Sequence, residues 1–247
     1  MLIAPIGGNL RKIPIFGVPS RITTLASLAG TYNYQGFGCA GRSGGDVQGS
    51  IPCASHTGTI KVTSGGAFTT CRDGNLGGPT PINCTKIGGG TATSTSTGRL
   101  YATATPGVYD FKTTPDGYHR GWFFAFTAGG QNVAVIDHDD DYTPSFGHSV
   151  ALSQASVISG QTDGNCFVKN DIGQRHLIAV TGNNFTDTND AGTTVSGTLT
   201  CDTPWTGLVS YQYTGGAASG VAGIATVGAF TYTSNTYPYL FGVGIKY

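Results

Sequence analysis

The chain of 247 residues contains no glutamate, and all 13 of its acidic residues are Asp. Charge of either sign is scarce, since Asp, Lys and Arg together make up 11% of the chain. The 13 Lys and Arg balance the 13 Asp, and they do not gather along one segment of the sequence. Nucleic acids and anionic membrane surfaces are bound by clustered basic residues, so the sequence predicts neither as a partner.

Long apolar runs are also missing. No segment has the apolar length that a membrane-spanning helix needs, so the sequence predicts no transmembrane helix. The first 30 residues do not resemble a secretory signal, because Pro5, Gly7, Gly8, Pro14 and Pro19 interrupt the apolar stretch. Met1 is the only Met, so the chain is interpreted as a processed form whose export signal is already absent.

Glycine and threonine dominate what is there, with 40 Gly and 35 Thr. Thr suits β-strands and Gly suits turns, whereas the missing Glu is a helix former. The sequence therefore predicts an all-β protein, an antiparallel sandwich or a barrel-like architecture, clipped by disulfides and carrying an extended N-terminal arm. The expected strands are 30–37, 58–63, 67–71, 99–105, 108–113, 121–127, 132–137, 149–153, 166–169, 176–181, 193–201, 207–213, 221–233 and 237–246.

The chain divides into an arm at 1–26 and an all-β body at 27–247. The body is either one fold or two modules with a break near 153–160, and both interpretations stay open. A short helix fits only at 22–28, with Thr23 or Thr24 as its cap. The stretches 88–98 and 182–192 are polar and rich in turn residues, so we expect surface loops there.

The arm has three prolines and cannot fold on itself. We expect it to add to an exposed sheet edge, of this chain or of another copy. The residues expected to make this assembly contact are apolar: Ile13, Ile15, Phe16 and Val18.

The six cysteines form an even set without the spacing typical of zinc sites. Disulfides persist in oxidising compartments, so we expect a secreted, extracellular or cell-surface protein, with a reduced chain as the alternative. Neighbours in sequence are the expected partners, namely Cys39 with Cys53, Cys71 with Cys84, and Cys166 with Cys201.

Five consecutive residues, 137–141, form the only charge cluster. If the preceding strand continues, Asp137, Asp139 and Asp141 share one face, and their carboxylates could bind Ca²⁺. The alternatives are a solvated acidic turn and a catalytic role. Apart from this Ca²⁺ the sequence indicates no cofactor.

Two further patterns suggest chemistry without the context that it needs. Gly41-Arg42-Ser43-Gly44-Gly45 matches the G-x-S-x-G pattern of serine hydrolases, but a loop follows the serine where a helix is required. Residues 187–192 have the opening spacing of an EF-hand loop, but they lack the distal Glu and the flanking helices, so we expect an Asn/Asp turn.

The leading hypothesis is therefore an exported, non-enzymatic surface or extracellular structural subunit that assembles with other copies of itself. The first alternative is a secreted module that binds a glycan or a small ligand. Its stacking aromatics would be among Tyr32, Trp122, Trp205, Tyr211 and Tyr213, although most of these are expected in the core. The second alternative is a secreted hydrolase that uses the cluster at 137–141.

Overall fold

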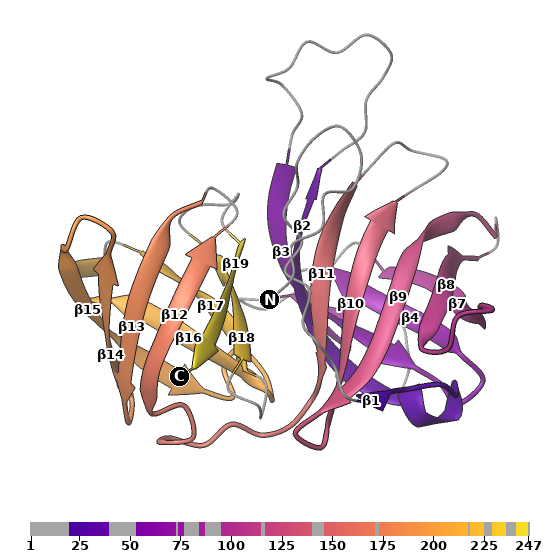
Figure 1. The fold of residues 1–247 in the computed structure, drawn as a ribbon, viewed down its shortest axis with the longest axis horizontal. Helices are drawn as coiled ribbons and strands as arrows, with labels where there is room; N and C mark the ends of the chain where they lie inside the picture. Colours follow the sequence, from indigo (N-terminus) through magenta and orange to yellow (C-terminus); the bar gives the residue numbers. More distant parts are fainter. Residues whose placement is uncertain are drawn as a thin grey trace, which may run out of the picture.

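The structure is a computed structural model of the chain. It describes residues 20–39, 53–72, 74–76, 84–86, 95–114, 117–139, 146–170, 173–216, 218–224, 229–235 and 241–246. These residues form antiparallel strands and two short 3-10 helices, arranged as two closed barrels of eight strands each, side by side (Figure 1). The predicted all-β fold is confirmed, and of the two predicted architectures it is the barrel. Neither helix in the described residues has the length and hydropathy to span a membrane.

Barrel 1 is the N-terminal barrel. Each strand pairs antiparallel with the next, and β11 closes the ring on β2. A two-residue strand, β1 (Ser20–Arg21), adds to the end of β9 beyond the pairing of β9 with β8. The barrel strands are β2 (Gly30–Cys39), β3 (Cys53–Val62), β4 (Ala67–Arg72), β7 (Thr95–Ala102), β8 (Val108–Thr113), β9 (His119–Ala128), β10 (Gln131–Asp139) and β11 (Phe146–Ser153).

Large side chains fill barrel 1, because alternate residues of each strand point inward. Tyr32, Tyr109 and Phe123 are among the largest fully buried side chains. The 3-10 helix η1 (Ala26–Leu28) adds Leu28 to this core, and the hydroxyl of Tyr32 donates to the carbonyl of Leu28 at 2.8 Å. The helix expected at 22–28 is thus a single short turn, at which Thr24 Oγ1 accepts the N–H of Ser27 at 3.3 Å.

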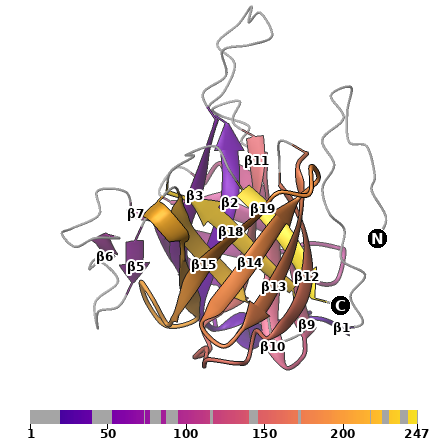
Figure 2. The same cartoon turned by 90° about the vertical axis from the view of Figure 1, so that its left-hand side faces the viewer.

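A hairpin interrupts barrel 1 between β4 and β7. Its strands are β5 (Gly74–Leu76) and β6 (Cys84–Lys86), and Figure 2 shows them to one side of the barrel body. The predicted disulfide Cys71–Cys84 ties the hairpin to the end of β4, with a Cα–Cα distance of 5.7 Å. Thr59 Oγ1 on the barrel wall donates to the carbonyl of Gly74 and accepts the N–H of Leu76. The hairpin is therefore fixed to the outside of barrel 1.

Barrel 2 has the same up-and-down order, and β19 closes on β12. The 3-10 helix η2 (Thr214–Gly216) follows β16. The strands are β12 (Gly164–Asn170), β13 (Arg175–Thr181), β14 (Asn184–Asn189), β15 (Thr194–Cys201), β16 (Leu208–Tyr213), β17 (Ser219–Ile224), β18 (Ala229–Ser234) and β19 (Phe241–Lys246).

Aromatic rings packed on glycines fill barrel 2. A Cβ on Gly242 would lie 2.1 Å from the ring of Tyr232, and one on Gly197 would lie 2.4 Å from the ring of Phe185. The rings of Tyr211 and Phe185 meet edge to face, with centroids 6.4 Å apart. Glycine is required at these positions because the rings occupy the space of a side chain.

The outer walls of the two barrels pack on each other. Phe241 of barrel 2 joins Phe126, Val133, Val150 and Leu152 of barrel 1 in one buried apolar cluster. These residues alternate with inward-facing ones, so the strands of barrel 1 that meet barrel 2 are apolar on both faces.

Gln35, on β2, links the barrels at the centre of this contact, where it is 1% exposed. Its Nε2 donates to the carbonyl of Val221 at 2.8 Å, and its Oε1 accepts the N–H of Gly223 and the hydroxyl of Thr231, each at 2.7 Å. A buried amide with both ends bonded stabilises one relative orientation of the barrels.

Residues 154–163 connect the barrels and overlap the stretch where the sequence placed a break. Asn33 Oδ1 accepts the indole N–H of Trp205 at 2.8 Å and the side-chain amide of Gln154 at 2.9 Å. Asp202 Oδ1 accepts the N–H groups of Val157 and Gly207, each at 2.9 Å. These backbone hydrogen bonds, the one from Gly207 first, lower the pKa of the Asp202 carboxyl.

The predicted pairing of Cys166 with Cys201 is wrong in this structure, in which both are free thiols. They lie on β12 and β15, with two strands of the barrel between them. Proximity in sequence is a poor guide to this pair, because the chain between the two residues forms β13 and β14, which lie between them in the barrel. Cys39 stands directly opposite Cys53 in the β2–β3 register, but their side chains lie outside the described set, so that disulfide remains a prediction.

Three of the strand and loop predictions also need correction. Residues 95–98, the end of the loop expected at 88–98, belong to β7. The stretch 182–192, expected as a loop, contains the strand β14. Phe185 and Asp187 of this strand are buried and point into barrel 2, while the polar residues that alternate with them face outward. The single strand expected at 221–233 is two strands, β17 and β18. The assembly residues Ile13, Ile15, Phe16 and Val18, and the loop that carries Ser43, lie outside the described residues.

Candidate functional site: an aromatic and basic face on barrel 1

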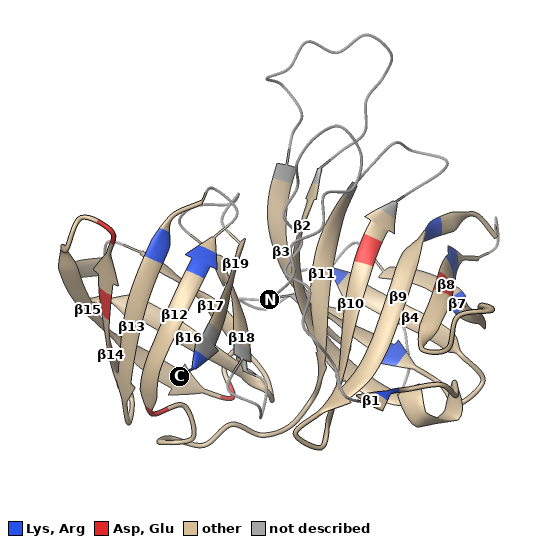
Figure 3. Ribbon diagram, in the orientation of Figure 1, with Lys and Arg blue, Asp and Glu red and all other residues tan. Residues whose placement is uncertain are grey.

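Strands β7 and β8 lie on the side of barrel 1 that is farthest from barrel 2, and β9 lies next to β8 (Figure 1). Their inward residues belong to the core, so the alternate residues point outward. We use the name β7–β9 face for the following outward residues: Arg99, Tyr101, Asp110, Lys112, His119 and Trp122. Figure 3 shows Lys, Arg and Asp positions close together on β7 and β8.

The strand register arranges one row of this face as aromatic, acidic, aromatic. Asp110 on β8 stands opposite Tyr101 on β7 and opposite Trp122 on β9. Tyr101 is 46% exposed, and Trp122 is half-buried. Side chains directly opposite in neighbouring strands lie within contact distance, so the carboxylate sits between two aromatic side chains.

The next row is basic. Arg99 on β7 stands opposite Lys112 on β8, and Lys112 stands opposite His119 on β9. The register shifts between Phe111 and Lys112, which leaves Arg120 as an extra residue in β9. Without this bulge, alternation would turn His119 into the barrel. The bulge re-aims it onto the outer face.

Asp110 fixes the two rows to each other. Its Oδ1 lies 2.6 Å from Nδ1 of His119, and its Oδ2 lies 3.1 Å from Nζ of Lys112. The imidazole of His119 in turn packs on the indole of Trp122, with ring centroids 4.7 Å apart. Each polar group of the face is therefore held by a neighbour that belongs to the face itself.

Cations also lie against the exposed tyrosines. The Arg99 guanidinium is 5.9 Å and the Lys112 ammonium 5.6 Å from the centroid of the Tyr101 ring. Arg120 lies 5.8 Å from the centroid of Tyr118, and its Nε donates to Thr113 Oγ1 at 3.0 Å. Such contacts restrain the long side chains and hold positive charge at the aromatic rings.

This arrangement suits a sugar. Sugar rings present C–H groups on their faces and hydroxyls around their edge, so flat aromatic side chains and fixed carboxylates bind complementary parts of one ring. Because the face is on a convex barrel wall, it is suited to an extended oligomer that lies along the wall.

Of the five aromatics proposed from the sequence as stacking platforms, only Trp122 belongs to this face. Tyr32 is inside barrel 1, and Trp205 is buried where the barrels meet. Tyr211 and Tyr213 are inside barrel 2, where burial is the largest cause that raises the pKa of both hydroxyls.

Sequence reasoning missed Arg99, Tyr101, Asp110, Lys112 and His119. Alternation within the predicted strands 99–105 and 108–113 would have placed four of them outward: Arg99, Tyr101, Asp110 and Lys112. The position of His119 could not be found in this way, because it depends on the bulge. The three basic side chains are far apart in sequence, which is why no basic cluster was seen in the chain.

The predicted Ca²⁺ site cannot be assembled from the described side chains. Asp137 stands opposite Trp122 on one side and His148 on the other, on the outer face of β10. The side chain of Asp139 and all of Asp141 lie outside the described residues. Among the side chains that are described, no three of His, Cys and Asp come together as a metal site. The Ca²⁺ remains a prediction.

A second polar cluster lies inside barrel 1. The Nε2 atoms of His56 and His138 each lie 2.9 Å from Oγ of Ser149. His56 is 7% exposed, and its Nδ1 has no hydrogen-bond partner among the described residues. Burial, followed by the charges of His138, Arg72 and His148, lowers the pKa of His56 well below its ordinary value. Ser149 is fully buried, so a substrate has no access to its hydroxyl.

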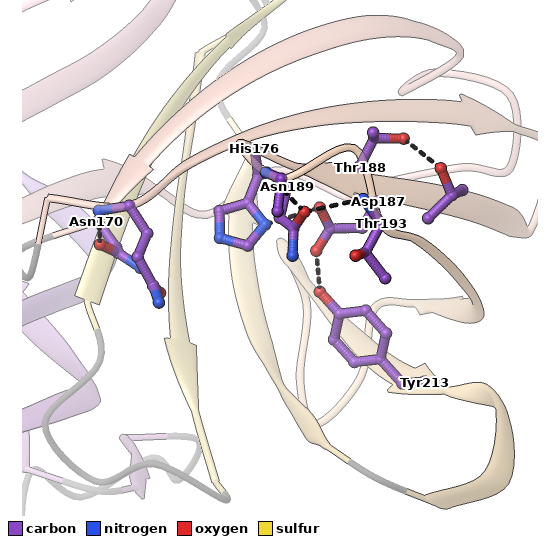
Figure 4. A network of polar contacts seen from close by, with 10 residues as sticks. Asn170, His176, Asp187, Thr188, Asn189, Thr193 and Tyr213 are labelled. Atoms are coloured by element: carbon purple, nitrogen blue, oxygen red, sulfur yellow. Dashed lines mark hydrogen bonds and ion pairs between the residues drawn. The ribbon is translucent and has the colours of Figure 1, made fainter.

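A third cluster lies inside barrel 2 (Figure 4). Asp187, 5% exposed, is 2.8 Å from Nδ1 of His176 and accepts the hydroxyl of Tyr213 at 2.5 Å. In the neighbouring turn, Asn189 Oδ1 accepts the N–H groups of Ala191 and Thr193, each at 3.0 Å. The predicted Asn/Asp turn is confirmed there, and Asp187 serves the barrel interior.

No protein-family model matches the chain, and neither the comparison with curated proteins nor that with solved structures gives a match.

Proposed function

We propose that this protein is an exported, non-enzymatic surface module that binds glycans through the β7–β9 face of barrel 1. The observation that carries the proposal is the row Tyr101, Asp110, Trp122, in which two aromatic side chains flank a fixed carboxylate on the barrel wall remote from barrel 2. A rigid barrel that presents such a row is already ordered before the ligand arrives, which reduces the entropy lost on binding.

Export is supported by composition and by the Cys71–Cys84 disulfide. Disulfides of this kind are typical of oxidising compartments, and a surface rich in Thr and poor in charge suits a protein outside the cell. The assignment as non-enzymatic is supported by the composition of the face. Glycoside hydrolysis normally uses two carboxylates, whereas the β7–β9 face as defined holds one, Asp110, which pairs with Lys112 and His119.

The test is a glycan array followed by titration calorimetry on the strongest hit. Tyr101→Ala and Trp122→Ala should each weaken binding about fivefold, since an aromatic contact is worth on the order of 1 kcal/mol. Phe167→Ala is the matched control, because Phe167 is 43% exposed on the outer wall of barrel 2. Equal losses in all three variants would contradict the proposed face. New reducing ends after incubation would contradict the non-enzymatic assignment.

The second candidate is a structural subunit that assembles with other copies through the arm, with Ile13, Ile15, Phe16 and Val18 in the contact. One observation favours it: β1, at Ser20–Arg21 within the arm, adds to the end of β9. A neighbouring copy could receive the arm along the same edge. Removing residues 1–19 while keeping β1 should abolish polymers in electron micrographs. Polymers that persist, or a full-length chain that is strictly monomeric, would contradict this candidate.

A further inference from the structure

The basic row of the β7–β9 face is unfavourable for a sheet without a ligand. Arg99 and Lys112 are direct cross-strand partners on the same face, and like charges in that position destabilise a sheet. Lys112 is relieved by Asp110 at 3.1 Å. Arg99 contacts the Tyr101 ring, and no carboxylate of the described residues lies within ion-pair distance of it.

Positive charge is in excess on these strands. β7, β8 and β9 carry three cations, Arg99, Lys112 and Arg120, against one carboxylate, Asp110, while the formal net charge of the whole chain is zero. Asp137 of β10 stands opposite Trp122 at the border of the face, so the cations outnumber the carboxylates on the β7–β8 side, where Arg99 and Lys112 lie beside Tyr101.

We propose that the β7–β9 face binds an acidic glycan, one whose sugars carry carboxylate or sulfate groups. This inference rests on the proposed glycan binding and adds the charge of the ligand. Arg99 and Lys112 both lie within 6 Å of the Tyr101 ring centroid. An acidic group on a sugar stacked at Tyr101 therefore meets two cations, and the guanidinium can bond it through two parallel N–H groups.

The position of Asp110 favours a glycan over a single-stranded nucleic acid, which also binds aromatic and basic residues. A carboxylate at the centre of the face accepts hydrogen bonds from sugar hydroxyls. A strand of DNA offers no free sugar hydroxyl along its chain, whereas an acidic glycan can place a hydroxyl-rich edge over Asp110 and its acidic group over Arg99.

The test uses pairs of polymers that differ only in charge, with the intact chain in each titration. The first pair is oligogalacturonate and its methyl ester, and the second is dextran sulfate and dextran, so the pairs distinguish a carboxylate from a sulfate. The variants are Arg99→Gln and Lys112→Gln, with Arg175→Gln on barrel 2 as the control for a lost charge. Arg175 is exposed at the start of β13. A poly-thymidine oligonucleotide is the nucleic-acid probe.

We expect the acidic member of at least one pair to bind about tenfold tighter than its neutral partner, since charge-assisted hydrogen bonds are worth about 1.5 kcal/mol or more. Arg99→Gln and Lys112→Gln should remove that preference, so that the ratio of acidic to neutral affinity falls to about one, and Arg175→Gln should leave the ratio unchanged.

Equal binding of acidic and neutral members overturns the charge inference and leaves the proposed glycan binding in place. Binding of no glycan overturns both. Tighter binding of the oligonucleotide than of any acidic glycan, or acidic binding that survives Tyr101→Ala and Trp122→Ala together, also overturns the inference, because the attraction would then be nonspecific. A melting curve of each variant shows whether it is still folded, so that a loss of binding is not mistaken for a loss of folding.

Discussion

The two barrels share a topology and differ in how they are filled. In barrel 1 the interior is packed by large side chains from many strands, with Leu28 of η1 added to them. Rings packed on glycines occur in both barrels, Phe68 on Gly98 in barrel 1 and Phe185 on Gly197 in barrel 2, but in barrel 2 a buried carboxylate, Asp187, lies among the rings. The eight-stranded topology therefore does not determine which side chains form the core, because different combinations of side chains can fill an interior of that width.

The outer walls differ in a way that bears on function. The walls that face each other are apolar and joined by Gln35, so they are unavailable to a ligand. The opposite wall of barrel 1 carries the β7–β9 face. The proposed glycan binding uses the wall of barrel 1 that does not pack on barrel 2.

The largest expected effect comes from separating the barrels. Gln35→Ala removes an amide whose loss leaves the N–H of Gly223 and the carbonyl of Val221 buried without that partner. Each unsatisfied buried group costs about 1 to 3 kcal/mol, so we expect a loss of about 4 kcal/mol of unfolding free energy. Urea unfolding should also change from one transition to two.

Single-tryptophan variants make the two transitions visible. Trp205→Phe leaves Trp122 to report on barrel 1, and Trp122→Phe leaves Trp205 to report on the junction and barrel 2. Gln212→Ala is the control, since Gln212 is exposed and bonds only its own turn. Coincident transitions in the Gln35 variant would mean that the apolar contact alone couples the barrels.

A smaller effect should be confined to barrel 2. Asp187→Ala leaves His176 and Tyr213 without their buried partner, and each unsatisfied buried polar group costs about 1 to 3 kcal/mol. The milder Asp187→Asn keeps an acceptor for the Tyr213 hydroxyl and should cost less. Urea unfolding followed by the fluorescence of Trp205 measures the unfolding free energy of both variants. Asp190→Asn, in the exposed turn, should leave it unchanged.

Removal of the disulfide should act on barrel 1 alone. Loop-closure entropy predicts a loss of about 3 kcal/mol for Cys71→Ala with Cys84→Ala, because the bond closes a short loop between residues 13 apart. The Trp122 reporter should detect this loss, and the Trp205 reporter should not. Cys166→Ala is the control, since it removes a free thiol. An unchanged melting curve of barrel 1 would show that the hairpin unfolds independently of the wall to which it is tied.

Much of this fold could be predicted from the sequence, for a reason that particular strands make clear. Tyr32 and Ile60 alternate with polar residues, so the period of two identifies their strands and their inward face. Closure into barrels could not be predicted, because it depends on pairings such as β2 with β11 and β12 with β19 that join residues far apart in the chain. The same limit explains the wrong pairing of Cys166 with Cys201.

The candidate site was less predictable than the fold. Trp122 is a stacking candidate by its residue type alone, whereas Asp110 and His119 can be assigned to the face only when the register of β8 and β9 is known. The bulge at Lys112 has no clear sequence signal, and it decides which way His119 points. A site built across strands in this way becomes visible only when the register is known.

The smallest expected effect concerns acid, and it again distinguishes the barrels. His56 is buried in barrel 1 with its pKa lowered well below 6.5, by burial first and then by the charges of His138, Arg72 and His148. A group whose folded pKa is depressed takes up a proton on unfolding, so its contribution to stability is fully present above pH 6.5 and is lost as the pH falls below that value.

The loss should be up to about 1.4 kcal/mol per pH unit until the folded pKa is reached. His56→Gln keeps a polar group near Ser149 and does not titrate, so the difference in stability between the two proteins isolates this histidine. We expect that difference to shrink from neutral pH toward pH 5 when Trp122 reports, and to be absent when Trp205 reports. A difference that stays constant with pH would mean that folding does not shift the pKa of His56, and a difference that grows as the pH falls would mean that His56 is protonated in the folded barrel. Its Nδ1 would then need an acceptor inside barrel 1, and the buried cluster with Ser149 would have to be interpreted as charged.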